Sequence, residues 1–177
     1  VPGGPIHRTY TISSSPSRPL SITLTVKAAG ASVGTRWMLD HVREGSLVKA
    51  IGPGGIFVPD VPPDRKLLLI SAGSGVTPMM SITTYRWDIG GKPDICFVQC
   101  ARRPSELVFR RHLEHMASRV PSIRLHYVVN EDDPHGAWSG YRGQFNQLML
   151  GLMAPDYLER EVYCCGPEPF MQVVRDM

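Results

Sequence analysis

The stretch Leu67-Leu-Leu-Ile-Ser-Ala-Gly-Ser-Gly-Val-Thr-Pro78 decides the fold. Its first four residues form a continuous apolar run, which is typical of a parallel strand buried on both faces. The turn that follows has no Cβ at Gly73 or Gly75, so backbone can approach a ligand there, and Pro78 suits the first turn of a helix. The amides and dipole of that helix start attract phosphate, although such a turn, taken alone, could also be purely structural.

Beyond this turn the sequence alternates between strand and helix patterns. Short apolar runs predict further strands at Ile95–Val98, Ile123–Val129 and Val162–Cys165. We expect helices in the intervals and at the end, at Met79–Trp87, Ser105–Ala117, Phe145–Leu152 and from Pro167 onward. Alternation of this kind predicts a doubly wound parallel sheet with helices on both faces, that is, an α/β fold.

The first 64 residues have a different pattern, of short strands broken by Gly, Pro and Ser. Ser21–Val26 alternates apolar and hydroxyl side chains, which predicts a half-buried strand, and Leu47–Ile51 predicts another. Between them we expect a helix from Thr35 to Val42, with Thr35 as its N-cap. The prolines that follow predict a linker to the α/β domain, and they are Pro59, Pro62 and Pro63.

The composition narrows the class of protein. The chain has 177 residues and a net charge of +3, and its basic residues form no sustained run, so nucleic acid is not the expected partner. There is no apolar run long enough to span a bilayer and no secretory signal peptide. The four cysteines form no C-x-x-C pair, so we expect no metal site and a cytoplasmic location.

A second motif, Tyr163-Cys-Cys-Gly-Pro167, comes at the end of the last predicted strand. Ligands of doubly wound sheets bind at the carboxyl ends of the strands, so this motif and the glycine turn should face one cleft. Cys165 alone would be interpreted as a buried thiol. Beside the glycine turn, a functional role is the better interpretation.

A third motif, Arg8-Thr-Tyr-Thr-Ile-Ser-Ser14, lies near the start. On a strand, Arg8 and Tyr10 would share one face, with Thr9, Thr11 and Ser13 on the other. A cation beside an aromatic ring suits a ligand that carries phosphates and a flat ring. A surface arginine beside a strand tyrosine is the alternative.

In this order, the three motifs together resemble the ferredoxin–NADP reductase superfamily. Gly52-Pro-Gly-Gly-Ile-Phe57 resembles the closing turn of that family's flavin barrel. The resemblance covers nearly the whole chain and implies part of an antiparallel FAD-binding β-barrel over residues 1–64, followed by the NAD(P)-binding α/β domain over residues 65–177. The stretch Glu161–Met171 is most similar to NADH-dependent reductases that feed Rieske-type or other oxygenases.

The resemblance implies roles for individual residues. On the flavin side, Arg8 would hold the FAD pyrophosphate and Tyr10 would pack on the isoalloxazine. The other flavin-binding positions implied are Thr9, Thr11, Ser13, Gly34 and Thr35. On the nicotinamide side the dinucleotide would be received by Gly73, Ser74, Gly75, Thr77, Gly166 and Pro167. Cys165 would lie beside the nicotinamide C4, and it is a candidate catalytic residue together with Thr77 and Ser13.

The implied function is FAD-dependent electron transfer from NAD(P)H to an iron–sulfur acceptor, such as a ferredoxin domain or a Rieske oxygenase. A non-catalytic or truncated member of the same fold is an alternative, and a nucleotide-binding module without flavin is a third. The joint retention of Arg8, Tyr10, Thr77 and Cys165 favours the enzyme, because a structural relic has no physical need for all four.

Two further expectations concern the choice of coenzyme and the extent of the barrel. Arg102 and Arg103 follow the second strand of the α/β domain with no acidic residue in the turn itself, which suits the 2′-phosphate of NADPH. The resemblance favours NADH, and we adopt NADH. Only seven residues precede Arg8, and no C-x4-C-x2-C pattern occurs. We therefore expect roughly half of the barrel to be missing from this sequence and no iron–sulfur cluster within it.

Overall fold

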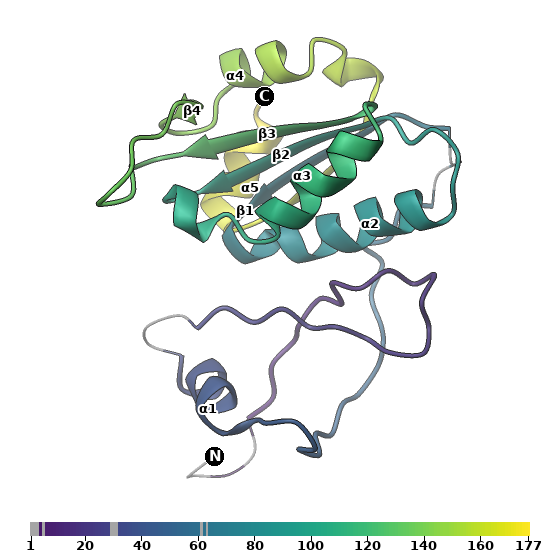
Figure 1. The fold of residues 1–177 in the computed structure, drawn as a ribbon, viewed down its shortest axis with the longest axis vertical. Helices are drawn as coiled ribbons and strands as arrows, with labels where there is room; N and C mark the ends of the chain where they lie inside the picture. Colours follow the sequence, from purple (N-terminus) through teal and green to yellow (C-terminus); the bar gives the residue numbers. More distant parts are fainter. Residues whose placement is uncertain (1–3, 5, 29–31, 61, 63) are drawn as a thin grey trace.

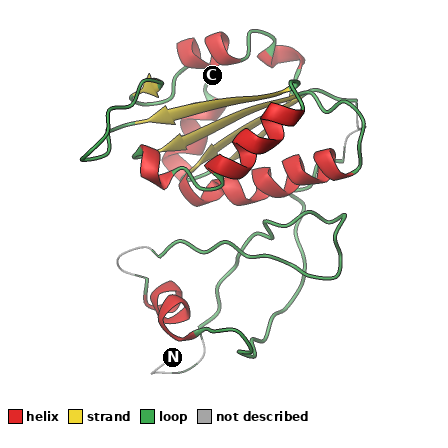
Figure 2. Cartoon of the chain, viewed as in Figure 1, coloured by secondary structure: helices red, strands yellow, loops and turns green. Residues whose placement is uncertain are grey.

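A computed structural model describes residues 4, 6–28, 32–60, 62 and 64–177 of the chain. Within them, one five-stranded parallel sheet has the strand order β4-β3-β2-β1-β5 (Figures 1 and 2). Its strands are β1 (Leu67–Ala72), β2 (Ile95–Ala101), β3 (Ile123–Val129), β4 (Tyr141–Arg142) and β5 (Glu161–Cys165). The predicted α/β fold with a parallel sheet is confirmed.

Helices cover both faces of this sheet (Figure 1). One face, with Leu69 and Phe97 in its core, packs against α2 and α3, and the other, with Ile70 and Val98, packs against α4 and α5. Side chains of β1 point to the two faces in turn, which explains why its apolar run is unbroken. The helices are α1 (Val33–His41), α2 (Val76–Asp88), α3 (Arg110–Arg119), α4 (Gln147–Met153) and α5 (Glu168–Arg175), with 3₁₀ turns η1 (Gly73–Gly75), η2 (Pro104–Glu106) and η3 (Tyr157–Glu159).

The direction of strand addition reverses at β1. The chain proceeds outward from β1 through β2, β3 and β4, and then returns to place β5 against the free side of β1. At such a reversal the connections leave on opposite faces and open a crevice outside the carboxyl ends of the two strands. That crevice lies where Ser71 of β1 pairs with Cys165 of β5.

The elements of residues 65–177 differ from prediction mainly at their ends, by up to three residues. Two differences are larger: the short strand β4 was not predicted, and the helix predicted from Ser105 to Ala117 is wrong as one helix. It forms as η2 and then α3, because Phe109 takes a left-handed backbone conformation (φ 63°) between the two. No Gly or Pro marks that position, so the break had no signal in the sequence.

Two strands predicted before residue 65 are wrong. Ser21–Val26 makes one antiparallel bridge, from Leu24 to Ile12, and no ladder. Leu47–Ile51 is irregular, with its two terminal side chains more than nine-tenths exposed. A strand needs a neighbour for its backbone donors and acceptors, and the described residues place none beside Leu47–Ile51.

The start of α1 also differs from prediction. The helix begins at Val33 with Ser32 in the N-cap position, so Thr35 is not the N-cap. Thr35 lies in the first turn, where its Oγ1 donates to the carbonyl oxygen of Ser32 at 3.4 Å. Of the linker prolines, Pro59 and Pro62 are in irregular backbone, and Pro63 lies outside the described residues.

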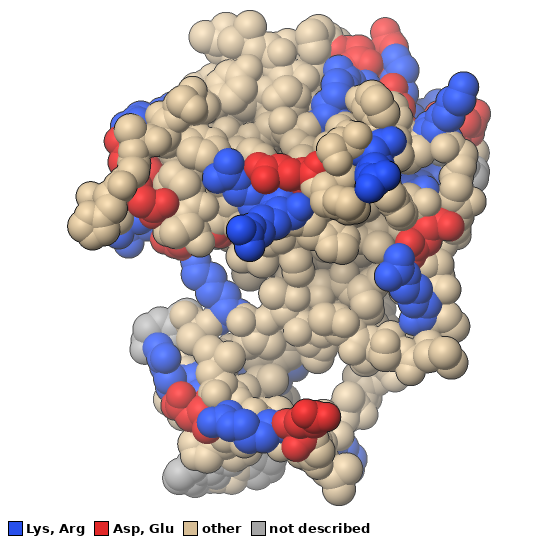
Figure 3. Space-filling view, viewed as in Figure 1, with Lys and Arg blue, Asp and Glu red and all other residues tan. Residues whose placement is uncertain are grey.

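The residues before 65 lie alongside α2 (Figure 1). On the face shown in Figure 3, Lys and Arg side chains are interspersed with Asp and Glu, and the surface is hollowed between these earlier residues and the sheet part. No helix in the described part of the chain is both long and apolar enough to cross a bilayer.

Candidate functional site

The glycine turn and the Cys-Gly-Pro motif meet at the reversal point of the sheet. A Cβ built on Gly75 would lie 2.1 Å from the carbonyl oxygen of Cys165 and 2.8 Å from the amide nitrogen of Gly166. These distances are too short for any side chain, so only glycine lets η1 approach β5. The structure therefore brings the two predicted motifs into direct contact.

The other two glycines of the motifs are required for different reasons. Gly73 has a positive φ of 56° and open space around it, so its constraint is backbone conformation. A Cβ on Gly166 would lie 2.9 Å from the Phe170 ring and 3.1 Å from the Cβ of Ala72, so its constraint is close packing. Together they hold the ends of β1 and β5 in a compact turn.

The start of α2 is a candidate anion site, although the Val76 amide already donates to the carbonyl oxygens of Gly73 and Ser74. Neither η1 nor α2 has a side-chain hydrogen bond at its N-cap. Thr77 is 6% exposed, and its Oγ1 donates to the carbonyl oxygen of Ser74 at 3.1 Å, so its hydroxyl stays within the turn. Ser74 is exposed, and Pro167 is exposed on the other side of the crevice. Free amides and a helix N-terminus are the usual receptor for a pyrophosphate.

Cys165, at the carboxyl end of β5, carries a neutral thiol that packs against the core on the α2 side of the sheet. Burial raises the pKa of Cys165, so its thiol stays protonated near neutral pH. Cys164 packs on the opposite face of the sheet, where burial raises the pKa of its thiol to about 11. Neither is in a disulfide. The chemistry open to Cys165 is therefore packing and weak hydrogen bonding, not attack as a thiolate.

A cavity of about 330 Å³ lies next to the turn. It is lined by three segments, Thr25–Lys27, Ser74–Thr77 and Ser105–Val108, of which Ser74, Val76 and Thr77 belong to the glycine turn and α2. Lys27 and Glu106 form an ion pair between the first and third of these segments. The cavity therefore lies between the earlier residues and the glycine turn, and its volume is in the range of ligand-binding pockets.

Arg102 and Arg103 share one acidic partner. The Nε of Arg102 donates to Glu131 Oε1 at 3.2 Å, and Nε and Nη2 of Arg103 donate to Oε2 at 3.1 and 2.9 Å. Hydrogen bonds from Arg103 and then Arg102 lower the pKa of Glu131, which keeps it ionised. Glu131 was not predicted as their partner, because it is 28 positions away from Arg103 in the sequence. Glu131 follows β3, and the pairing of Ala101 with Val129 brings the two strand ends together.

Four of the predicted flavin-binding residues gather around α1. A Cβ on Gly34 would lie 3.6 Å from the Nε of Arg8, so the arginine lies against the first turn of the helix. The Arg8 side chain is exposed, with Nη1 donating to the His7 carbonyl oxygen at 2.8 Å. The Tyr10 hydroxyl reaches Met38 Sδ at 3.4 Å. Thr35 is buried in the same turn, and Thr9 and Thr11 are exposed.

Ser13 does not join that group. It is 5% exposed, and its Oγ donates to the Thr23 carbonyl oxygen at 3.0 Å and is hydrogen-bonded to Thr25 Oγ1 at 2.8 Å. Thr25 lines the cavity. Ser13 is thus connected to the cavity through Thr25.

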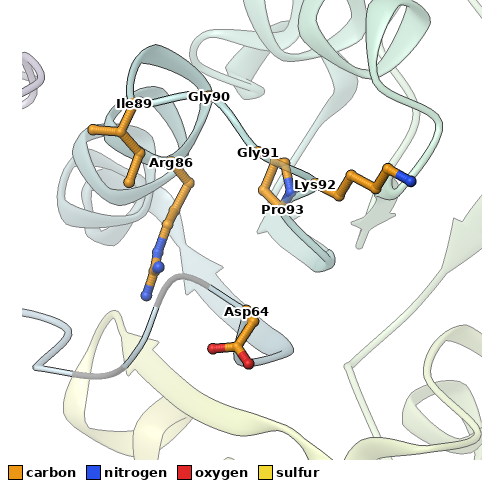
Figure 4. Close-up of a pocket in the computed structure, with 7 residues that line it drawn as sticks. All are labelled: Asp64, Arg86, Ile89, Gly90, Gly91, Lys92 and Pro93. Atoms are coloured by element: carbon orange, nitrogen blue, oxygen red, sulfur yellow. The ribbon is translucent and has the colours of Figure 1, made fainter.

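A second cavity, of about 210 Å³, lies at the opposite edge of the sheet (Figure 4). It is formed where α2 ends and before β2 begins, with Arg86 from the helix and Asp64 from the turn before β1 extending toward it. Ligands of this fold bind at the carboxyl ends of the strands, and this is the amino edge. No group of three or more potential metal-ligating side chains occurs in the part of the chain that the structure describes.

Comparison with known proteins agrees with this geometry. The oxidoreductase NAD-binding domain family matches residues 69–176. The chain is 60% identical over 176 residues to the stachydrine N-demethylase reductase subunit of Rhizobium meliloti, covering 99% of this chain and 50% of that protein. It is 43% identical over 178 residues to a glycine betaine monooxygenase reductase subunit of Pseudomonas aeruginosa, covering 100% and 48%.

The chain thus spans about half the length of these curated relatives. Among solved structures, the FAD/NAD-binding domain of a nitric oxide dioxygenase from Vibrio cholerae has a TM-score of 0.76 at 24% identity, covering 96% of this chain and 69% of that one, which is a likeness of fold. The family match covers well over half of the sequence. The chain therefore belongs to the family of oxidoreductase NAD-binding domains, as its motifs predicted.

Proposed function

We propose that this chain is the flavin- and nicotinamide-binding part of an oxygenase reductase, in which electrons pass from NADH through FAD to an iron–sulfur acceptor. The contact of Gly75 with Cys165 is the observation that carries the proposal, because it joins the glycine turn and the Cys-Gly-Pro motif at the carboxyl ends of β1 and β5, where coenzymes of this fold bind. Two relatives are reductase subunits of a demethylase and of a monooxygenase, which supports an oxygenase as the destination of the electrons.

The residues of the glycine turn suit the coenzyme pyrophosphate. Gly73 and Gly75 leave the backbone open, and the uncapped amides of η1 and α2 would donate to phosphate oxygens. Ser74, Gly166 and Pro167 would border the same ligand. Buried Thr77 and the neutral thiol of Cys165 would pack on the nicotinamide and exclude water from the transfer path.

The residues around α1 suit the FAD pyrophosphate and ring. Arg8 lies exposed beside the close approach at Gly34, so its guanidinium is free to turn from the His7 carbonyl to a phosphate. Thr35 lies in the same helix turn, and Tyr10 would offer a ring face to the isoalloxazine, with Thr9 and Thr11 alongside. Ser13, held by Thr25, would lie at the polar edge of the ring.

FAD, when bound, accepts a hydride and releases electrons singly. This chain's residues then have the simpler tasks of binding, orienting and excluding water. The cavity of about 330 Å³ between Thr25 and Thr77 is where the two ligands would meet. Thr77 lines this cavity, Ser13 is connected to it through Thr25, and Cys165 lies against the glycine turn beside it, so these three are our candidate catalytic residues.

NADH rather than NADPH is the coenzyme we propose. Glu131 accepts hydrogen bonds from Nε of Arg102 and from Nε and Nη2 of Arg103, and an NADPH 2′-phosphate would meet its negative charge. The free ribose hydroxyls of NADH would instead find a carboxylate acceptor. Arg102, Arg103 and Glu131 are exposed, and water and salt screen exposed ion pairs. We therefore expect only a modest preference for NADH over NADPH.

The division into residues 1–64 and 65–177 remains a proposal, and the surface of the first part supports it. Leu20, Leu47 and Ile56 are almost fully exposed, and Ile22, Val48 and Ile51 are also exposed. Large apolar side chains in such number call for a covering surface. We infer that further barrel strands of a longer protein cover them, and that the protein, with four unpaired cysteines, acts in the cytoplasm.

The decisive experiment is the visible spectrum of the longer parent protein before and after anaerobic addition of NADH. We expect a flavin spectrum that bleaches. A colourless protein, or a flavin that NADH leaves oxidised, would refute the proposed function.

A further inference from the structure

Helix α2 has one polar side that faces the residues before 65. Thr77, Ser81 and Asp88 are spaced by four and seven residues, which places them on one side of a helix. Thr77 lines the cavity, and the other two contact the earlier residues. The 13-residue helix rises about 1.5 Å per residue and so connects its ends rigidly.

Asp88, at the end of α2, binds the earlier residues through both carboxylate oxygens. Arg18 makes a bidentate contact, with Nη2 2.6 Å from Oδ1 and Nε 3.0 Å from Oδ2. The Ser17 hydroxyl donates to Oδ2 at 2.5 Å. The Asp88 side chain is 11% exposed, but that of Arg18 is 68% exposed, so the ion pair is open to water on the arginine side.

Two turns earlier, Ser81 provides a second contact. Its Oγ donates to the Ser14 carbonyl oxygen at 2.7 Å. Because these two contacts lie at separate points on α2, they fix both the distance of segment 13–18 from the helix and its orientation along it. A single contact could not fix the orientation.

The segment 13–18 is also hydrogen-bonded to a residue that lines the cavity. Ser14 Oγ accepts from the Thr23 amide at 3.0 Å, and the Ser13 amide donates to the Thr23 carbonyl oxygen at 2.8 Å. Ser13 Oγ is in turn hydrogen-bonded to Thr25, which lines the cavity across from Thr77. Asp88 is therefore connected to the cavity in two ways. One connection runs along α2 to Thr77, and the other runs through the hydrogen bonds of segment 13–18 to Thr25.

We propose that Asp88 is a positioning residue for hydride transfer, which through Arg18 and Ser17 holds the flavin-side wall of the cavity at a set distance from the coenzyme turn. The inference rests on the proposed function above. Exposed ion pairs add little to global stability, so the role lies in geometry. Displacements near 1 Å cost up to about a hundredfold in rate in such reactions.

The test replaces Asp88 by the isosteric, uncharged residue, Asp88→Asn. The control is Glu114→Gln, which removes the same charge from a helix residue paired with Arg110 away from the cavity. Hydrogen exchange of the 177-residue chain without flavin gives the first measurement. We expect faster exchange at the amides of Ser13 and Thr23 in Asp88→Asn, unchanged exchange in β1, and no change in the control.

The second measurement uses the flavin-loaded parent protein. Asp88→Asn should slow flavin reduction by roughly tenfold, weaken the long-wavelength charge-transfer absorbance of the NADH complex, and leave the KM for NADH nearly unchanged. Ser81→Ala should act in the same direction, more weakly, and serves if Asp88→Asn does not fold. Asp88→Glu, which keeps the charge, should recover part of the rate.

The outcomes separate the two ideas. Unchanged exchange in Asp88→Asn, or faster exchange with an unchanged reduction rate, would overturn the positioning role. A parent protein whose flavin NADH does not reduce in the unsubstituted form would overturn the proposed function itself.

Discussion

The α-carbon of Gly75 faces the carbonyl group of Cys165 so closely that a methyl group would lie 2.1 Å from its oxygen. These residues come from the two strand ends at which the sheet reverses, and their contact sets the floor of the proposed coenzyme crevice. The contact joins motifs 90 positions apart in the sequence, Gly75 and Cys165.

Gly75→Ala should separate the glycine turn from β5. Because both contacts of the added methyl are backbone atoms, we expect a loss of about 1–3 kcal/mol in the free energy of unfolding and at least tenfold weaker NADH binding. Urea denaturation and fluorescence titration measure the two effects. Gly151→Ala is the matched control, because Gly151 lies in α4 with open space around it. It should neither lower the free energy of unfolding nor weaken NADH binding. Normal coenzyme affinity in Gly75→Ala would contradict the site.

Cys165→Ser should slow flavin reduction with little change in stability, because the neutral thiol packs on the nicotinamide and bears no structural bond. Stopped-flow absorbance in anaerobic NADH gives the rate. Cys164→Ser changes the opposite face of the sheet and should leave the rate alone. We also expect no disulfide between the two, since adjacent strand residues point apart. Equal rates in both variants would count against the role of Cys165.

Arg8→Ala should weaken flavin retention, since the Nε of Arg8 lies only 3.6 Å from where a Cβ on Gly34 would be. Mass spectrometry of the parent protein should find FAD, and finding only FMN would exclude the proposed dinucleotide site. Lys49→Ala removes an exposed cation from an irregular segment and should retain flavin normally.

The 177-residue chain, which spans about half the length of its curated relatives, should hold little FAD on its own. Adding the upstream sequence of the parent should restore binding, because the exposed apolar residues would then be covered. Tight, stoichiometric FAD in the short chain would show that the first 64 residues need no further strands.

Glu131→Gln should release Arg102 and Arg103 for a phosphate. We expect kcat/KM for NADPH to rise by about fivefold relative to NADH, the size that an exposed ion pair allows. Steady-state rates with both coenzymes measure the ratio. Glu114→Gln, with its own arginine partner on α3, should leave it unchanged. A clear NADPH preference in the unsubstituted protein would refute our choice of coenzyme.

Asp156 should make the protein sensitive to acid. Hydrogen bonds from Arg160, opposed by burial and aided by Lys66, hold the pKa of Asp156 far below its usual value. Its contribution to stability is therefore present above the unfolded pKa of about 3.9 and is lost as the pH falls toward the folded value.

Asp156→Asn should lower the free energy of unfolding at pH 7 by about 1–3 kcal/mol and flatten its decline between roughly pH 4 and pH 2. Arg160 is 1% exposed and would keep only Asp94 as an ion-pair partner. Urea denaturation across that range measures both effects. Glu159→Gln, in an exposed pair with Lys66, is the control, and an equal effect there would refute the assignment.

Prediction from sequence worked best where one segment carries its own signal. The buried run of β1 and the turn at Gly73 to Gly75 were found because a strand covered on both faces must be apolar throughout, and a tight approach needs glycine. Prediction failed at Leu47–Ile51, because the described residues place no partner strand beside this apolar pattern. It also failed at Phe109, where a residue other than glycine takes the left-handed conformation.

The amino-acid order was sufficient for the α/β sheet, its crevice and the family, because these depend on periodicity and on short motifs that act within a few residues. The arrangement of charges required the folded chain. Glu131 meets Arg103 because β2 and β3 pair in parallel, and Asp88 meets Arg18 because α2 packs beside the early residues. Contacts across 28 and 70 positions depend on strand order and helix packing, and no local pattern of side chains encodes either.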